Sequence, residues 1–182
     1  MSKPNPASPA LSTSDGHLAS ALAQVGAEID HQPLRSSALA RIMREAFHGS
    51  DAGGAWDWRK AYDMMQAAAV QALLRGDSSE DDYFAAKLLA SRLLTETRRS
   101  EQQIRLQQFS TPLPFSALAL RAAAVRKGET VLEPSAGTGA LAAFATRAGA
   151  TLVLNEIDPF RQRLLRAVFG GEVTGYDGEH ID

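Results

Sequence analysis

The stretch VLEPSAGTGALAAFA, residues 131–145, decides the fold of the second half of this chain. Apolar strand-forming residues pass into Glu133, two glycines follow at Gly137 and Gly139, and an alanine-rich helical pattern comes next. Glycine adopts backbone conformations that other residues avoid, and it lets a ligand approach the backbone closely. The start of a helix also offers unpaired N–H groups and a positive dipole end to a carboxylate or phosphate. The stretch therefore predicts a strand, a ligand-binding turn and a helix.

The same strand–helix order continues downstream of this turn. TLVLNEID (151–158) has the pattern of a second buried strand, PFRQRLLRAVF (159–169) that of a helix, and EVTGYD (172–177) that of a third strand. Strands that alternate with helices of this length indicate a parallel sheet. Ligands of such sheets bind beyond the carboxyl ends of the strands, where the strand order reverses. The glycine turn occupies such a position.

The first half of the chain differs in composition and in its hydrophobic pattern. Residues 1–15 are rich in Pro, Ser and Ala and predict a disordered tail. Residues 16–108 predict an all-helical region, with segments at 17–29, 36–47 and 56–76 and a fourth that begins at Ser79 and runs on toward residue 109. Packing between helices is a better interpretation than a ligand pocket for Trp56, Trp58, Met64 and Met65. The domain boundary is expected at residues 108 and 109.

Composition limits the function classes. The 182 residues include 45% hydrophobic and 22% charged residues, without a cysteine, and the formal net charge is -2. No apolar run approaches the length of a membrane span and no signal peptide is visible, so we expect a cytoplasmic protein without a membrane partner. The net charge argues against a uniformly basic nucleic-acid binder but allows a local basic face. The scattered histidines predict no metal site.

Two carboxylates at neighbouring strand ends sharpen the prediction. Glu133 ends the first strand and Glu156 ends the second, and adjacent parallel strands bring their carboxyl ends together. A carboxylate at Glu156 can accept both hydroxyls of a ribose, and Ile157 offers an apolar edge for a base. The alternatives are a solvated Glu156 and a glycine-rich turn that binds nothing.

Two classes of nucleotide ligand compete for this turn. Gly137, Gly139 and Ala142 formally satisfy the dinucleotide fingerprint Gly-x-Gly-x-x-Gly/Ala. That fingerprint usually places its first glycine directly after the strand, whereas residues 133–136 intervene here. A carboxylate at Glu133 would repel a pyrophosphate but could hold an ammonium group. A ligand with an amino acid at one end and ribose–adenine at the other, S-adenosylmethionine, therefore fits better.

The motifs resemble those of class I S-adenosylmethionine-dependent methyltransferases, most closely the DNA methyltransferases that modify adenine N6. LEPSAGTG resembles their first motif, NEIDP their second, and QFSTP (108–112) the cofactor-contacting segment before the first strand. The resemblance implies that the methionine part of the cofactor is surrounded by Thr111, Glu133, Ser135, Ala136, Gly137 and Gly139. It implies that Glu156, Ile157 and Asp177 hold the nucleoside.

The whole chain resembles the opening segment of bacterial strawberry notch-like methylase–helicase proteins. In these large polypeptides a methyltransferase-like domain precedes a helicase, so the resemblance implies DNA as a partner of the parent protein. The family's catalytic motif, Asn/Asp-Pro-Pro-Tyr/Phe, is not found before Asp182. We therefore expect no catalytic residue here and no methyl transfer by this chain alone. A non-catalytic module that binds DNA or protein is the alternative.

The expected fold is thus α/β: an N-terminal all-helical region, then an incomplete Rossmann-like methyltransferase sheet over residues 109–182. In the family's strand order the first strand lies between the second strand and the fourth. The expected sheet lacks the fourth strand, so one edge of the first strand would be open. The N-terminal helices are expected to cover that edge. A partner chain, self-association or partial disorder of residues 130–182 are the other possibilities.

Overall fold

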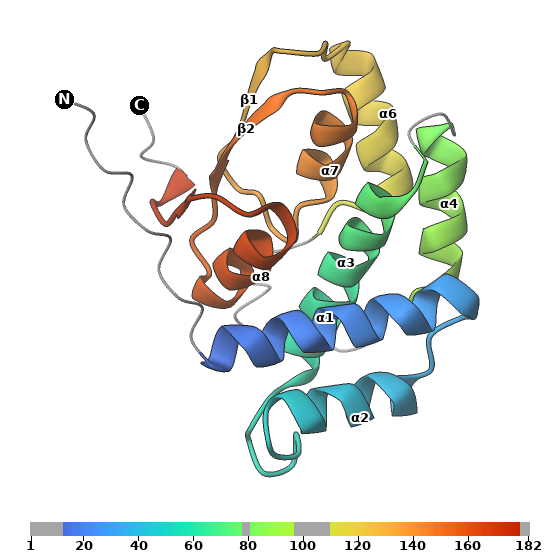
Figure 1. Ribbon diagram of the computed structural model, residues 1–182, viewed down its shortest axis with the longest axis vertical. Helices are drawn as coiled ribbons and strands as arrows, with labels where there is room; N and C mark the ends of the chain where they lie inside the picture. The colour runs from blue at the N-terminus through green and yellow to red at the C-terminus, as the bar shows by residue number, and fades with distance from the viewer. Residues whose placement is uncertain (1–12, 78–80, 97–109, 179–182) are drawn as a thin grey trace, which may run out of the picture.

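The computed structural model describes residues 13–77, 81–96 and 110–178 and shows a mixed α/β fold (Figure 1). Its described residues form seven helices and one parallel sheet of three strands, in the order β1-β2-β3. None of the helices in these residues combines the length and the apolar character needed to cross a membrane.

The helices predicted for the first half are confirmed. They are α1 (Thr13–His31), α2 (Ser36–Ala46), α3 (Trp58–Arg75) and α4 (Asp82–Arg92). Asp57 caps α3, because its side chain accepts a hydrogen bond from the backbone N–H of Lys60. The predicted tail is wrong for residues 13–15, which already belong to α1, and residues 1–12 lie outside the described residues.

The ends of α4 differ from the prediction. Its N-cap is Asp81, whose carboxylate accepts the N–H groups of Tyr83 and Phe84. The helix ends at Arg92, since Leu93 takes an extended backbone and the Leu94 N–H donates to the sulfur of Met65. The predicted start at Ser79 and the continuation over residues 97–109 lie outside the described residues, as does the predicted domain boundary.

The second half confirms the alternation of strands and helices. It consists of α6 (Leu113–Ala123), β1 (Thr130–Glu133), α7 (Ala140–Arg147), β2 (Thr151–Asn155), α8 (Pro159–Phe169) and β3 (Val173–Thr174). β1 and β2 pair so that Leu132 lies opposite Val153. The Asp158 carboxylate caps α8 by accepting the N–H groups of Phe160 and Arg161, and Pro159 occupies the first turn.

One apolar core joins the two halves of the chain. A single cluster of buried side chains includes Leu22 and Met65 from the N-terminal helices together with Phe144 of α7 and Leu164 of α8. In Figure 1, α7 and α8 lie between the strands and helices α1 and α3, against which they pack. Trp56, Met64 and Met65 are buried in this core and Trp58 packs against it half-buried, as the sequence predicts. The N-terminal helices therefore help to support the sheet, through their packing on α7 and α8.

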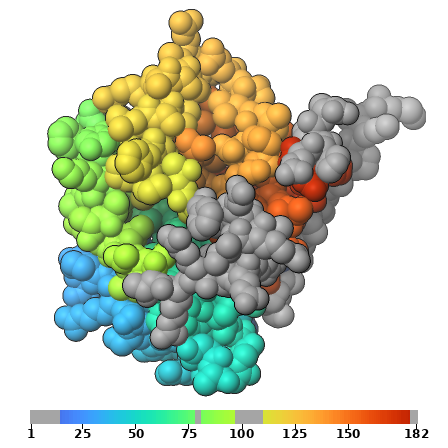
Figure 2. Space-filling view, turned by 180° about the vertical axis from the view of Figure 1, so that it is seen from behind, coloured from blue at the N-terminus to red at the C-terminus, as the bar shows by residue number. Residues whose placement is uncertain are grey.

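The outer face of the sheet carries apolar side chains. Leu132 is 53% exposed and its neighbour Val153 is 47% exposed, whereas Leu154, on the other face, is buried beneath α7 and α8. β1 is the outer strand of the described sheet. Among the described residues, the predicted cover of this edge by the N-terminal helices is wrong, because helices α1 to α4 pack on one another and on α6, α7 and α8, and β1 stays exposed or half-buried. α4 and α6 instead pack side by side at the back of the molecule (Figure 2).

Candidate cofactor site

The two glycines of the turn after β1 have different roles. Both have a positive φ, +58° at Gly137 and +92° at Gly139. A Cβ at Gly139 would lie 2.5 Å from Cε2 of Phe169 in α8, so close packing within the protein requires this glycine. Among the described residues, its chain neighbours apart, a Cβ at Gly137 would have no atom within 4 Å. The space above Gly137 is therefore open within this part of the chain, as the approach of a ligand would require.

Glu156 links the end of β2 to this turn. Its side chain is buried, with one carboxylate oxygen 2.7 Å from the N–H of Gly137 and the other 2.8 Å from the N–H of Asp158. Burial raises the pKa of Glu156 above its ordinary value, and these backbone hydrogen bonds and the charge of Arg161 oppose the rise. The acidic group predicted for the ribose thus lies directly beside the predicted glycine turn.

Asn155 joins the carboxyl ends of all three strands. Its amide nitrogen donates to the carbonyl oxygens of Pro134 and Tyr176, each at 2.9 Å. Its amide oxygen accepts hydrogen bonds from the Thr174 hydroxyl and the Tyr176 N–H. Sequence reasoning missed this residue, although a polar side chain at the end of an apolar strand is a usable signal. Asn155 fixes the relative position of the loops that follow β1, β2 and β3.

The residues between Glu133 and the glycines face different surroundings. Glu133 is half-buried, and burial raises its pKa while the backbone N–H of Ser135 donates to it and opposes that rise. Ser135 is exposed. Ala136 is buried, and its N–H donates to the Asn155 carbonyl oxygen at 2.9 Å. The Glu133 carboxylate is therefore placed at the same sheet edge as Glu156.

The predicted nucleoside residues of the second and third strands lie at this same edge. Ile157 is 48% exposed directly after Glu156. Asp177 is exposed and follows Tyr176, which Asn155 holds. A Cβ added at Gly178 would lie 3.2 Å from the Pro134 carbonyl oxygen, so the segment after β3 lies against the turn after β1.

Thr111 is the predicted residue that the structure places apart from the others. It lines a pocket of about 500 Å³ between α3, the end of α4 and the starts of α6 and α7. Gln66, Glu96 and Thr138 also line this pocket, but Glu133, Glu156 and Asp177 do not. Of the glycine turn, Thr138 is the residue that shares this pocket with Thr111.

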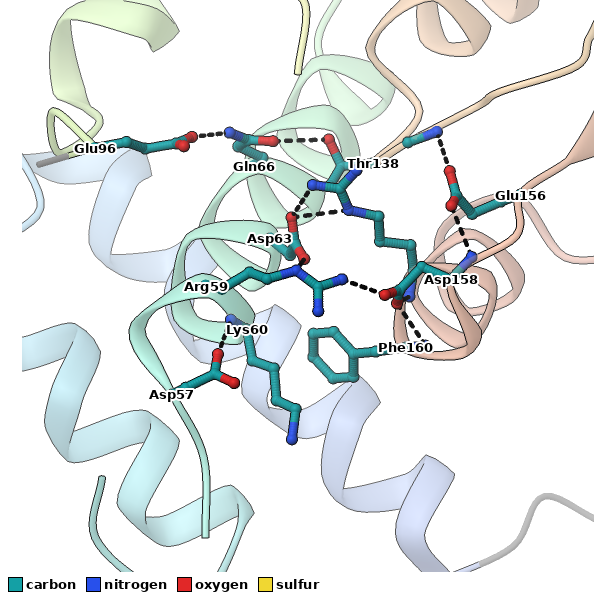
Figure 3. Close-up of polar contacts among 12 residues, drawn as sticks. Asp57, Arg59, Lys60, Asp63, Gln66, Glu96, Thr138, Glu156, Asp158 and Phe160 are labelled. Carbon is teal, nitrogen blue, oxygen red and sulfur yellow. Dashed lines mark hydrogen bonds and ion pairs between the residues drawn. The ribbon is translucent and has the colours of Figure 1, made fainter. Parts of the chain in front are cut away.

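A buried ion-pair network supports the turn that carries Glu156 (Figure 3). Asp158 pairs with Arg59 of α3, and Arg161 donates two hydrogen bonds to Asp63 of α3, at 2.8 and 3.0 Å. Burial alone would raise the pKa of Asp158, but the N–H of Arg161 and the Arg59 guanidinium outweigh this effect and hold it below its ordinary value. Asp158 before Pro159 is a readable helix-start signal, whereas its pairing with α3 could not be predicted from the sequence.

The carboxyl edge of the sheet presents carboxylates, a backbone turn with open space above it among the described residues, and an apolar side chain at Ile157. In the described part of the chain, no group of three or more His, Asp or Glu side chains is placed to hold a metal ion. No family model, curated protein or solved structure matches this chain.

Proposed function

We propose that this chain binds S-adenosylmethionine at the carboxyl edge of its sheet, as the cofactor-binding segment of an adenine-N6 DNA methyltransferase-like protein of the methylase–helicase type. In this proposal the sheet is an incomplete Rossmann-like methyltransferase sheet. DNA is the partner of the parent protein.

The contact between Glu156 and the backbone of Gly137 carries the proposal. It brings the acidic end of the second strand to within 2.7 Å of the glycine turn after the first. A ligand that lies above Gly137 would therefore have a carboxylate at hand for two vicinal hydroxyls. Ile157 and the segment of Asp177 lie beside it, where a purine ring could rest. Glu133 is available for an ammonium group at the other end.

Binding of the demethylated product, S-adenosylhomocysteine, tests the proposal by calorimetry. We expect this ligand to bind and NAD to be ignored, because Glu133 would repel a pyrophosphate. Gly137→Asn tolerates the positive φ better than other replacements and fills the open space, so it should weaken binding about tenfold or more. Gly128→Asn is the matched control, since Gly128 also has a positive φ and open surroundings but precedes β1. Binding of NAD without S-adenosylhomocysteine, or unchanged binding by Gly137→Asn, would overturn the proposal.

One observation favours the second candidate, a non-catalytic module that binds DNA or protein. Glu156 is only 4% exposed, and each of its carboxylate oxygens already accepts a backbone hydrogen bond. In such a module Glu156 would serve only to hold the turn closed. The calorimetric titration separates the two candidates, because the module would bind neither S-adenosylhomocysteine nor NAD.

A further inference from the structure

Helix α3 of the N-terminal region contacts both loops of the candidate site. Gln66 of α3 accepts a hydrogen bond from the Thr138 hydroxyl at 3.0 Å. Asp63 of the same helix accepts two hydrogen bonds from Arg161, and Arg59 pairs with Asp158. Figure 3 shows these side chains extending from one face of α3 toward the glycine turn and toward the start of α8.

The contact with the glycine turn acts at its centre. Thr138 stands between Gly137 and Gly139 and is 3% exposed. Its hydroxyl is directed to Gln66, whose amide nitrogen in turn donates to the carboxylate of Glu96. A movement of Thr138 would carry the Gly137 N–H with it, because the two residues are covalent neighbours. The side chain of Gln66 thus constrains the turn on which the ligand would rest.

The contact with the second loop acts on Glu156. Asp158 is held by Arg59, caps α8 and donates its own N–H to the Glu156 carboxylate at 2.8 Å. Arg161, one turn into α8, is held by Asp63. These four charged side chains are all buried or nearly so. These contacts fix the position and orientation of the Glu156 carboxylate relative to α3.

Buried ion pairs contribute little net stability on average, because the cost of desolvation offsets the attraction, but they can specify one geometry. We propose that α3 fixes the position of the loop after β1 relative to the loop after β2, with Gln66, Asp63 and Arg59 as positioning residues for the nucleoside site. This inference rests on the proposed function for its ligand. It assigns the helical region a role in cofactor affinity through the loops that it positions, in place of a separate DNA-contacting role.

A contact of the same type that lies away from the loops provides the control. Arg147 of α7 pairs with Asp82 and donates to the carbonyl oxygens of Leu73 and Asp77, near the end of α3. It joins the same two parts of the molecule, and its own side chain is buried to a similar degree, 6% exposed, whereas that of Asp82 is 39% exposed. Arg147→Met should therefore weaken the packing of the two parts without changing the loops specifically.

Hydrogen exchange of the Gly137 amide, compared with a core amide such as that of Leu22 in the same sample, tests the positioning role. Thr138→Val removes the hydroxyl without changing the size of the side chain and should accelerate exchange at Gly137 at least tenfold relative to Leu22. Thr138→Ser keeps the hydroxyl and should restore the wild-type ratio. Arg147→Met should change the exchange rates of both amides by the same factor. An unchanged Gly137 ratio in Thr138→Val would overturn the inference.

The second loop is tested with Asp63→Leu combined with Arg161→Met, which replaces one buried ion pair by apolar side chains. We expect the Asp158 amide to exchange at least tenfold faster relative to Leu22, and S-adenosylhomocysteine to bind at least fivefold more weakly. A double variant that leaves both quantities unchanged contradicts the inference. If the double variant does not fold, the Thr138 pair decides. If the exchange ratios change as expected but the wild type binds no S-adenosylhomocysteine, the positioning role stands and the proposed function falls.

Discussion

The Glu156 carboxylate accepts a hydrogen bond from the backbone N–H of Gly137. Glu156 follows β2, whereas Gly137 lies in the turn that follows β1. In the free protein this bond closes the glycine turn onto the second strand. A bound ribose would meet a carboxylate that is already oriented, since its other oxygen is held by the Asp158 N–H. The same bond makes Glu156 part of the fold, so its replacement should affect both stability and ligand affinity.

Replacement of Glu156 by alanine should lower the affinity for S-adenosylhomocysteine about tenfold or more, because about 1.5–3 kcal/mol of charge-assisted hydrogen bonding is lost. Unfolding by urea should also show a loss of about 1–3 kcal/mol, since the buried N–H groups of Gly137 and Asp158 lose their acceptor. Calorimetry and urea unfolding measure the two effects on the same sample. A variant that is less stable yet binds as the wild type does would assign Glu156 to the fold alone.

Adenosine affinity should depend on pH through Glu156. Burial raises the pKa of this carboxyl above its ordinary value of 4.5, so the protonated form persists into a higher pH range in the folded protein. A raised pKa favours the folded state at pH values below 4.5, and this contribution is lost as pH rises through the folded pKa. Only the charged carboxylate of Glu156 accepts hydrogen bonds from two ribose hydroxyls. The affinity for adenosine should therefore increase as pH rises through the pKa of Glu156 in the folded protein. Titrations of adenosine in a pH series should show this, and Glu156→Gln should flatten the profile. A profile that is equally steep in Glu156→Gln would assign the dependence to another group.

The two glycines should respond differently to alanine. Gly139→Ala places a Cβ 2.5 Å from the ring of Phe169 at a φ of +92° and should cost about 2–4 kcal/mol of unfolding free energy. Gly137→Ala meets open space and should cost only about 1–2 kcal/mol, from backbone strain. Thermal and urea unfolding of the two variants provide the comparison. Equal losses would show that the Phe169 contact is not what requires Gly139.

Loss of the Asn155 side chain should be among the most damaging polar changes. Asn155→Ala leaves the carbonyl oxygens of Pro134 and Tyr176 without their donor, and we expect a loss of about 3 kcal/mol or more. Thr174→Val removes only one hydroxyl that donates to Asn155 and should cost about 1 kcal/mol. Urea unfolding checks both values. A small loss in Asn155→Ala would mean that water replaces the amide and that the strand ends do not depend on it.

The outer face of the sheet should promote association. Leu132 of β1 and Val153 of β2 are neighbouring, half-exposed apolar side chains on that face, and β1 is the edge strand of the described sheet. Light scattering should show that the apparent mass of the chain rises with concentration, and Val153→Lys should suppress the rise. Phe84→Lys is the control, since Phe84 is 68% exposed on α4, away from the sheet. A concentration-independent mass for the wild type, or an equal effect of Phe84→Lys, would contradict this expectation.

The elements of the second half could be predicted because each is encoded locally. The apolar runs of β1 and β2, the glycine turn and the Asp158-Pro159 helix start are all readable within a few residues. The helices of the first half follow from their spacing in the same way. What the sequence could not show is how α3 meets α8, because Asp63 and Arg161 are far apart along the chain and neither belongs to a motif.

What differs from the prediction, or goes beyond it, has equally specific causes. The large apolar faces of the N-terminal helices predict a cover for the edge of β1, but in the described residues those faces pack on one another and on α6, α7 and α8. The packing of Phe169 against Gly139 could not be foreseen, because Phe169 lies thirty residues further along the chain. The resemblance groups Thr111 with the other cofactor residues, and its place in the pocket beside Thr138 could not be read from motif order.

The most direct test of the account follows the backbone amides of Gly137 and Ile157 by NMR while S-adenosylhomocysteine is added to the 182-residue chain. We predict that both amide signals shift together and saturate at one ligand concentration, because a single ligand would span the first and second strand ends, and that equal amounts of NAD leave them in place. Signals that stay unchanged at Gly137 and Ile157, or that move only with NAD, would contradict the assignment of this edge as an S-adenosylmethionine site.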